Sequence, residues 1–344
     1  MTPDAPLAVK LPTLRLGALR LESPFVQAAL SGYSDRPMRV LARRHGAAYT
    51  VHEVLIDRFV REVRSASARA RHFVVGDEEH PVGAQLMGSE PAEFPAAAER
   101  LVEAGYDAID INFGCPVRSA MGGCRGGYHL GQPDVALDIV RTVRRTVPEH
   151  LPVTVKMRRG IDDTEASRTS FFRILDGAFD AGVAAVTVHG RTVEQKYVGP
   201  SSWPFLRDVK AHAGDRTILG SGDLFSAEDA IRMLAETGVD GVTLARGAIG
   251  NPWIFRSCLE LAAGRVPTPP SISEQREVLE AHRDLLLEIH GERGWLTPLR
   301  RHAVKYARHH PDGNAVRDAF GRAHAPEAFA AVLEQFYGSE YGVG

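Results

Sequence analysis

Short apolar runs rich in β-branched residues recur along the first 250 residues, and helix-compatible polar stretches separate them. Eight runs fit this description, and we expect each to form a strand: residues 24–30, 48–54, 82–87, 108–114, 153–157, 185–190, 217–222 and 241–246. Two of the stretches between them, residues 91–104 and 227–237, carry apolar side chains at helical spacing and precede a glycine that can cap a helix. Eight strand–helix repeats predict an α/β protein with a (β/α)8 TIM barrel rather than an open doubly wound sheet.

Different patterns precede and follow the predicted barrel. Residues 13–23 alternate around Gly17, which predicts a hairpin that closes the bottom of the barrel. Three prolines within residues 267–270 break the pattern, and helical periodicity then covers residues 274–290, 295–309 and 325–337. We therefore expect an N-terminal segment with a hairpin (1–23), a catalytic barrel (24–266) and a small helical domain (267–344).

Composition excludes several classes of protein. The 344 residues are 44% hydrophobic, enough for a large core, and the cysteines at 115, 124 and 258 show neither a disulfide framework nor metal-ligand spacing. The first residues do not resemble a signal peptide, and no apolar run approaches the roughly 18 residues of a membrane span. We therefore expect a cytoplasmic protein without a metal ion or a membrane contact.

The net charge of −2 gives no general reason to expect nucleic-acid binding, so that case depends on local clustering. The predicted helical domain is rich in basic residues: Arg293, Arg300, Arg301, His302, Lys305, Arg308, His309, His310, Arg317 and Arg322. Such a set is typical of a solvated helix surface, and it also suits a surface that contacts a phosphate backbone. Charge alone leaves both interpretations open.

The strand over residues 108–114 ends in Cys115 and Pro116, so a thiol follows the carboxyl end of a strand. The loop over residues 121–129 holds four glycines, which permit close approach of the backbone to a bound ligand. Cys115 also suits a small buried apolar position, so its chemistry depends on its neighbours.

Catalytic groups of a TIM barrel lie at the carboxyl ends of the strands. In this chain those ends carry Ala28, Ala29, Leu30, Gln85, Asn112, Cys115, Lys156, Arg158, His189, Arg191, Ser221, Gly222, Asp223, Ala245 and Arg246. The last two loops suit a phosphate group, while Lys156 and His189 suit hydrogen bonds to a flat, electron-accepting ring. A phosphate anchor together with such a ring suggests flavin mononucleotide (FMN). The alternative is a phosphorylated sugar in an aldolase or isomerase.

Six motifs in this order resemble the flavin-dependent tRNA-dihydrouridine synthases of bacteria: residues 34–39 (SDRPMR), 111–117 (INFGCPV), 155–158 (VKMR), 188–192 (VHGRT), 220–223 (GSGD) and 245–253 (ARGAIGNPW). The resemblance covers most of the chain. It implies that FMN is bound over the barrel mouth and reduced by NADPH. It further implies hydride transfer to C6 of a uridine in tRNA, with a cysteine that protonates C5.

The same resemblance implies roles for individual residues. Cys115 would be the general acid, and Asn112 would position the uracil. Lys156, His189 and Gln85 would contact the flavin ring, with the other cofactor residues Ala28, Ala29, Leu30, Ser221, Gly222, Asp223, Ala245 and Arg246 at its remaining parts. The residues expected to contact the substrate or its RNA are Arg158, Arg191, Arg301 and Lys305.

Two segments depart from the family pattern. The first strand ends in Ala28-Ala29-Leu30, where the family usually has Ala-Pro-Met. In the loop after Cys115 the family usually has a lysine and paired leucines, whereas this chain has Ser119, Ala120, Cys124, Arg125, Tyr128 and His129. Cys124 is a candidate second thiol and His129 a candidate auxiliary acid. The divergent loop leaves the identity of the substrate more open than the chemistry.

The sequence therefore predicts an enzyme that reduces uridine to dihydrouridine in structured RNA, with tRNA as the expected partner. It does not distinguish NADPH from NADH, because no Gly-x-Gly-x-x-Gly fingerprint joins a strand to a helix. Alternative substrates are a uridine in ribosomal RNA and a free pyrimidine, as in the dihydroorotate dehydrogenases. A non-catalytic RNA-binding barrel is the alternative from another class.

Overall fold

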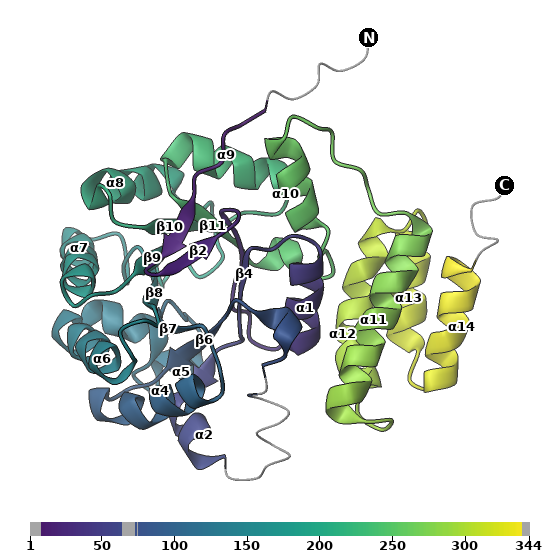
Figure 1. Ribbon diagram of the computed structural model, residues 1–344, viewed down its shortest axis with the longest axis horizontal. Helices are drawn as coiled ribbons and strands as arrows, with labels where there is room; N and C mark the ends of the chain where they lie inside the picture. The colour runs from purple at the N-terminus through teal and green to yellow at the C-terminus, as the bar shows by residue number, and fades with distance from the viewer. Residues whose placement is uncertain (1–7, 64–72, 74, 339–344) are drawn as a thin grey trace.

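The computed structural model describes residues 8–63, 73 and 75–338. Eight parallel strands form a closed ring, in which β11 pairs with β3 and β4 pairs with β6 (Figure 1). They are β3 (Phe25–Gln27), β4 (Tyr49–Val51), β6 (Val82–Met87), β7 (Ala108–Phe113), β8 (Val153–Arg158), β9 (Ala185–His189), β10 (Ile218–Ser221) and β11 (Gly241–Leu244). Each coincides with one of the eight apolar runs, with β8 extending one residue beyond its run, so the predicted TIM barrel is confirmed. A short strand, β5 (Leu55–Ile56), pairs with the end of β6.

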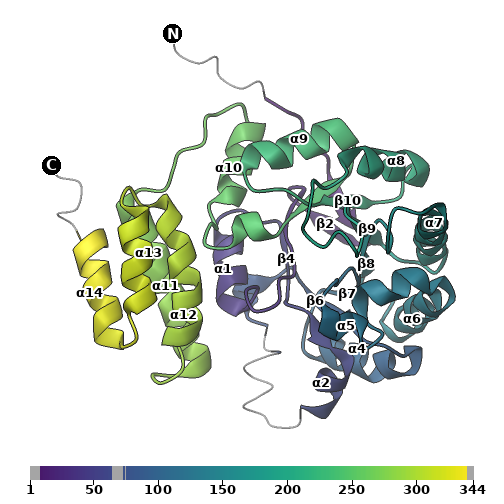
Figure 2. The same ribbon diagram turned by 180° about the vertical axis from the view of Figure 1, so that it is seen from behind.

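Helices surround the strands on the outside of the ring (Figures 1 and 2). They are α1 (Arg36–Arg44), α2 (Asp57–Glu62), α4 (Phe94–Glu103), α6 (Pro133–Thr146), α7 (Glu165–Asp180), α8 (Trp203–Ala213), α9 (Ala227–Thr237) and α10 (Ile254–Ala262). The ends of α9 illustrate how the sequence sets these boundaries. Ser226 and Asp229 form a capping box at its start, and Gly238 ends it with a left-handed φ of +71°.

The strand register brings polar residues to one level at the carboxyl end of the barrel. Asn112 on β7 pairs with Lys156 on β8, and Arg158 on β8 pairs with His189 on β9. His189 is in turn the partner of Ser221 on β10. Side chains separated by up to 109 residues in the sequence therefore share one rim.

The N-terminal hairpin closes the opposite end of the barrel. Its strands, β1 (Leu14–Leu16) and β2 (Leu19–Leu21), pair antiparallel around Gly17, whose φ is +58°. Leu14, Leu16 and Leu21 are buried in one cluster with residues from β3, β4, β7, β9 and β10. Hydrophobic burial thus fixes the hairpin across the amino ends of the strands, as the alternating sequence predicted.

The C-terminal helices form a bundle beside the barrel (Figure 2). They are α11 (Ile272–His290), α12 (Leu296–Tyr306), α13 (Gly313–Arg322) and α14 (Pro326–Tyr337), with the 3-10 turn η5 (Ala307–His309) after α12. Their core also includes Leu41 of α1 and Trp253 from the start of α10, so apolar packing joins the bundle to the barrel. Irregular chain over residues 265–271 connects the two. None of the described helices is long and apolar enough to cross a membrane.

Candidate active site

A cleft of about 750 Å3 opens at the carboxyl ends of the barrel strands. Every residue that the sequence predicted for cofactor binding lines it: Ala28, Ala29, Leu30, Gln85, Lys156, His189, Ser221, Gly222, Asp223, Ala245 and Arg246. Cys115, Asn112, Arg158 and Lys305 line it as well, whereas Arg191 and Arg301 do not. The residues predicted from the strand ends therefore share one cleft, with Arg191 as the exception, and of the two residues predicted from the helical tail Lys305 lines it and Arg301 does not.

A chain of hydrogen bonds rises from the barrel interior to the floor of the cleft. The Thr154 hydroxyl and the Gln85 side-chain amide donate to the two oxygens of the Asp110 carboxylate, at 2.6 and 2.7 Å. Burial raises the pKa of Asp110, and these two hydrogen bonds oppose that shift because they stabilise the charged form. The Gln85 oxygen is then free to accept from the Asn112 side-chain amide at 2.6 Å. The chain therefore fixes the orientation of both amide side chains.

Asn112 connects this chain of hydrogen bonds to the loop that contains Cys115. Its side-chain oxygen accepts hydrogen bonds from the backbone N–H groups of Gly114, at 2.8 Å, and Cys115, at 3.0 Å. The Arg158 guanidinium donates to the carbonyl oxygen of Gly114 at 2.9 Å, on the other side of the same turn. Cys115 is partly exposed at the cleft wall. Its backbone is therefore held from two directions while its thiol remains accessible.

The glycine-rich loop packs against the cysteine. It contains the short helix α5 (Arg118–Met121) and the 3-10 helix η3 (Gly126–Gly131). A Cβ atom at Gly126, whose φ is +61°, would lie 2.8 Å from the Cβ of Cys115. The N–H of Gly127 donates to the Cys115 carbonyl oxygen at 3.0 Å. The sequence suggested that these glycines admit a ligand, but in the structure two of them, Gly126 and Gly127, lie against Cys115 instead.

Neither extra candidate of this loop lines the cleft. His129 is buried, its Nε2 lies 3.0 Å from the carbonyl oxygen of Gly88, and burial lowers its pKa. Cys124 is exposed, has a φ of +54° and shares a hydrogen bond with the Tyr128 hydroxyl. The structure therefore gives no support to an auxiliary acid or a second thiol here.

Lys156 is a cationic hydrogen-bond donor of the site, and His189 is a neutral one. Burial, helped by the charge of Arg158, lowers the pKa of Lys156 to about 8. No hydrogen-bond acceptor for its ammonium group is found among residues 8–63, 73 and 75–338. Burial and the neighbouring cations Lys156 and Arg158 lower the pKa of His189 to about 2, so its imidazole is neutral at physiological pH. Lys156 is only partly buried and lines the cleft, where a cation without an acceptor favours binding of an electron-rich group.

Arginines dominate the rim beyond these two residues. Arg246 lies 3.5 Å from the Asp223 carboxylate, and its guanidinium is 4.9 Å from the centre of the Tyr197 ring. Arg158 contacts the same ring at 5.5 Å. Arg191, expected at the substrate, is buried instead and donates to Asp223 at 2.8 Å and to the carbonyl oxygen of Gly199. Its charge holds the loop after β9 against the loop after β10, and we no longer assign it to RNA.

Helix α12 and the turn η5 that follows it extend the cationic rim from the helical domain. Lys305 and Arg308 line the cleft, and Arg308 also donates to the carbonyl oxygens of Gly247 and Ile249, at 2.9 and 3.0 Å. Arg301, one helical turn before Lys305, is exposed and donates to the Gly32 carbonyl oxygen at 2.6 Å. His302 and His310 are buried, so the solvated basic surface is smaller than the composition of the tail suggested.

Comparison with known proteins gives the family. The model of the "Dihydrouridine synthase (Dus)" family matches residues 26–339. This chain belongs to the dihydrouridine synthase family. It is 32% identical over 326 residues to the tRNA-dihydrouridine synthase B of Xanthomonas campestris, covering 94% of this chain and 96% of the relative. It is also 32% identical to a probable tRNA-dihydrouridine synthase of Mycobacterium tuberculosis, covering 95% of this chain and 86% of the relative.

Solved structures from outside the family share the barrel. An old yellow enzyme homologue from Zymomonas mobilis matches with a TM-score of 0.53 and 16% identity, over 75% of this chain and 96% of that one. Morphinone reductase matches with a TM-score of 0.55 and 14% identity, over 76% of this chain and 93% of the reductase. At such identities the similarity shows the fold alone, so the site of this family member is interpreted from its own residues.

The sequence analysis did not predict two groups of residues at the site. Asp110 and Thr154 lie inside the barrel, and only their register with Gln85 reveals the hydrogen-bond chain. Tyr197 and Phe225 flank Arg246 at the cleft wall, each with its ring centre 4.9 Å from the guanidinium. Both residues lie in irregular loops, so neither helical nor strand periodicity in the sequence indicates them. An exposed aromatic residue in a loop after a barrel strand was the one available signal.

Proposed function

We propose that this protein is an FMN-dependent tRNA-dihydrouridine synthase, which reduces the C5–C6 double bond of a uridine in tRNA with NADPH or NADH. Membership of the dihydrouridine synthase family supports the reaction, and the two relatives named above supply the substrate class. One observation carries the proposal to this chain: Cys115 stands on the wall of a cleft that also holds Lys156 and His189.

The polar groups of the cleft fit FMN. The ammonium group of Lys156 has no acceptor among the described residues, and an electron-rich ring supplies one. His189 is neutral and therefore provides a hydrogen bond without a further charge. Gly222, with φ +114°, has no room for a Cβ because Ser201 and His189 occupy that position. Packing therefore requires glycine at this position, and Gly222 lines the cleft.

We assign the residues by the part of FMN that each suits. Lys156, His189 and Gln85 would hold the ring, and the backbone of Ala28, Ala29 and Leu30 would support it. The phosphate end would be held by Ser221, Gly222, Asp223, Ala245 and Arg246, where Arg246 supplies the positive charge. When bound, the reduced flavin supplies a hydride for C6 of the uracil.

Cys115 is assigned as the general acid. Reduction of the double bond adds a hydride at C6 and a proton at C5, and the Cys115 thiol supplies the proton. A thiol releases a proton near neutral pH and a serine hydroxyl does not, which explains the residue type. The resulting thiolate recovers its proton from water between turnovers. Asn112 both holds the loop of Cys115 and offers its amide at the cleft, so it positions acid and uracil together.

The RNA is proposed to lie along α12. Arg301 and Lys305 lie one turn apart on α12, and Arg308 follows in the turn η5; Lys305 and Arg308 line the cleft, so the three cations lead toward the site. The target uridine must leave its stack before its C5–C6 edge reaches Cys115, which costs a few kcal/mol. Tyr197 is 57% exposed at the cleft wall, within 5.5 Å of the guanidinium groups of Arg158 and Arg246, and offers an aromatic contact for an unstacked base.

Two features weigh against the alternative functions. A free pyrimidine needs no second domain, yet α12 supplies cations to the cleft of this protein. A non-catalytic barrel needs no ordered thiol, yet the hydrogen-bond chain from Thr154 to Cys115 is complete. Both observations favour reduction of a uridine within an RNA.

The test is the anaerobic absorption spectrum of the purified protein. We expect a flavin spectrum that bleaches with NADPH or NADH and returns when tRNA that lacks dihydrouridine is added, with dihydrouridine then present in the RNA. Fully modified tRNA is the control, and it should leave the flavin reduced. A flavin that bleaches but responds to no tRNA would refute the substrate, and a protein that binds no FMN after reconstitution would refute the reaction.

A further inference from the structure

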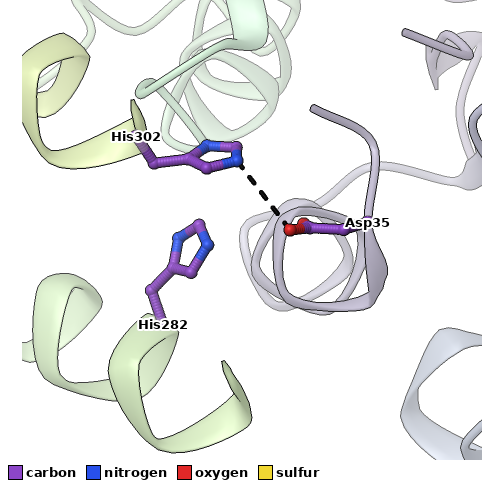
Figure 3. Close-up of side chains that lie close together, drawn as sticks. All are labelled: Asp35, His282 and His302. Atoms are coloured by element: carbon purple, nitrogen blue, oxygen red, sulfur yellow. Dashed lines mark ion pairs between the residues drawn. The ribbon is translucent and has the colours of Figure 1, made fainter. Parts of the chain in front are cut away.

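Three potential metal ligands meet where the barrel contacts the helical domain (Figure 3). Asp35 is the N-cap of α1 in the barrel, His282 lies in the middle of α11, and His302 lies on α12. One ligand atom from each falls within 4.8 Å of the other two, and Nε2 of His302 lies 4.0 Å from Oδ2 of Asp35. None of these atoms belongs to the cleft lining.

The cluster contains a buried ring nitrogen without a partner. His282 is 0% exposed, its Nδ1 lies 3.1 Å from the Tyr306 hydroxyl, and its Nε2 has no hydrogen-bond partner among the described residues. Figure 3 shows the His282 ring turned toward the space between His302 and Asp35. A buried polar atom that loses its water without a replacement costs free energy. The Nε2 atom of His282 therefore indicates a ligand for this space.

The protonation states suit a cation. Burial lowers the pKa of His302 to about 3 and that of His282 well below its ordinary value, so both rings are neutral and keep a lone pair. Burial raises the pKa of Asp35 to about 6, which leaves a carboxylate at neutral pH although burial disfavours its charge. The space therefore faces two neutral imidazoles and one negative charge.

We propose that Asp35, His282 and His302 bind one divalent transition-metal ion of the zinc class, which joins the barrel to the helical domain. Two imidazoles and a carboxylate are a donor set that Zn2+ uses in proteins, with water as the fourth ligand. Bonds of about 2.0–2.1 Å place tetrahedral ligand atoms about 3.4 Å apart, so pairs of ligand atoms that now lie up to 4.8 Å apart approach each other by about 1.4 Å at most. The Tyr306 hydroxyl at Nδ1 of His282 orients that ring toward the ion.

The position of the site connects it to the cleft. His302 lies between Arg301 and Lys305 on α12, and its ring is 5.4 Å from the ring of Tyr33 in an edge arrangement. Tyr33 lines the cleft. A bound ion thus fixes the helix that carries Arg301 and Lys305, and it does so without touching the reacting atoms. The sequence analysis expected no metal ion, because these ligands are 20 to 267 residues apart and show no metal-binding spacing.

The test is metal binding by the full-length protein, measured with the metal alone. After chelation and dialysis the protein is titrated with Zn2+, and in parallel with Co2+, whose visible absorption reports a tetrahedral site. We expect one ion per chain, a dissociation constant in the micromolar range or below, and an unfolding midpoint that rises with free Zn2+. Binding should fall at least tenfold in His282→Gln, His302→Gln and Asp35→Asn. Asn is itself a good N-cap, so Asp35→Asn retains the start of α1.

His150→Gln is the matched control, because His150 is exposed on the barrel and outside the cluster. It should bind Zn2+ like the wild type, with the same rise in the unfolding midpoint. The proposal is overturned if the wild type binds no stoichiometric ion, or if the three cluster variants bind as well as His150→Gln does. None of these measurements uses FMN or tRNA, so their outcome is independent of the proposed function.

Discussion

The side-chain oxygen of Asn112 accepts a hydrogen bond from the backbone N–H of Cys115, at 3.0 Å. The same side chain donates to Gln85 at 2.6 Å, and Gln85 donates to the buried Asp110. One amide therefore links the interior of the barrel to the turn that presents the thiol. The site consequently depends on residues that never touch a substrate.

Replacing Cys115 by alanine should abolish uridine reduction and spare cofactor reduction. Loss of a general acid slows its step by roughly 10²- to 10⁴-fold, while the residues assigned to FMN are unchanged. Stopped-flow absorbance would show bleaching by NADPH at the wild-type rate and slow reoxidation by tRNA. Cys124→Ser is the control, since Cys124 is exposed outside the cleft lining, and it should behave as wild type. Wild-type reoxidation in Cys115→Ala would refute the assignment.

Replacing Asn112 by alanine should lower both stability and turnover. The Gln85 oxygen and two backbone N–H groups lose their partner, which costs on the order of 1–3 kcal/mol in the free energy of unfolding. Asn112→Asp keeps an acceptor for the turn but no donor for Gln85. We expect it to hold the turn yet bind FMN more weakly. Urea unfolding and flavin titration measure the two effects, and equal behaviour of both variants would contradict the hydrogen-bond chain.

Lys156 predicts opposite pH dependences for FMN affinity and for stability. Its lowered pKa, about 8 against an ordinary 10.5, means that the free protein loses this ammonium as pH rises through 8. FMN affinity should therefore fall above pH 8. Stability without FMN should instead rise between pH 8 and 10.5, because there the unfolded chain holds the proton and the folded protein does not.

Lys156→Met provides the control for both pH dependences. It lacks the titrating group, so its FMN affinity should be weak and independent of pH over this range, and its unfolding curve should lose the corresponding slope. Fluorescence quenching of FMN and denaturant unfolding at several pH values measure the two quantities. An unchanged pH profile in Lys156→Met would exclude Lys156 as the responsible group.

Charge reversal on α12 should weaken RNA binding in a salt-dependent way. Lys305→Glu, alone or with Arg301→Glu, should raise the KM for tRNA severalfold or more and reduce the salt slope of binding by about one per lost phosphate contact. Bleaching by NADPH should be unaffected. Arg317→Glu on α13 is the matched control, since Arg317 is exposed and lies outside the cleft lining. Equal effects of Lys305→Glu and Arg317→Glu would show that α12 has no special role.

The barrel was predictable because its buried strands require apolar residues, and these form recognisable runs in the sequence. Strands buried on both faces, such as Val153–Arg158, read as apolar runs, and capped helices such as Ala227–Thr237 separate them. The candidate site followed from one rule about strand ends. Helix α13 was not predicted, because Gly313–Arg322 contains two glycines and lies behind the turn signal Pro311-Asp312.

The rest of the site depends on contacts between distant residues. Arg191 looked like a substrate contact because it follows a strand end, but Asp223, 32 residues later, accepts its hydrogen bonds. The sequence analysis included His302 and His310 in the basic surface, but helix packing buries both side chains. Whether a charged side chain faces solvent, a partner or a ligand is set by tertiary packing, and local sequence does not record it.

The N-terminal hairpin has a consequence for the order of events. Because Leu14, Leu16 and Leu21 fill the amino end of the barrel, the cleft at the carboxyl ends of the strands is the place in the described part of the chain where we expect both the nucleotide and the RNA to bind. We therefore expect the two to occupy the cleft in turn. Steady-state rates should therefore give parallel double-reciprocal lines, with each substrate inhibiting at high concentration by occupying the place of the other.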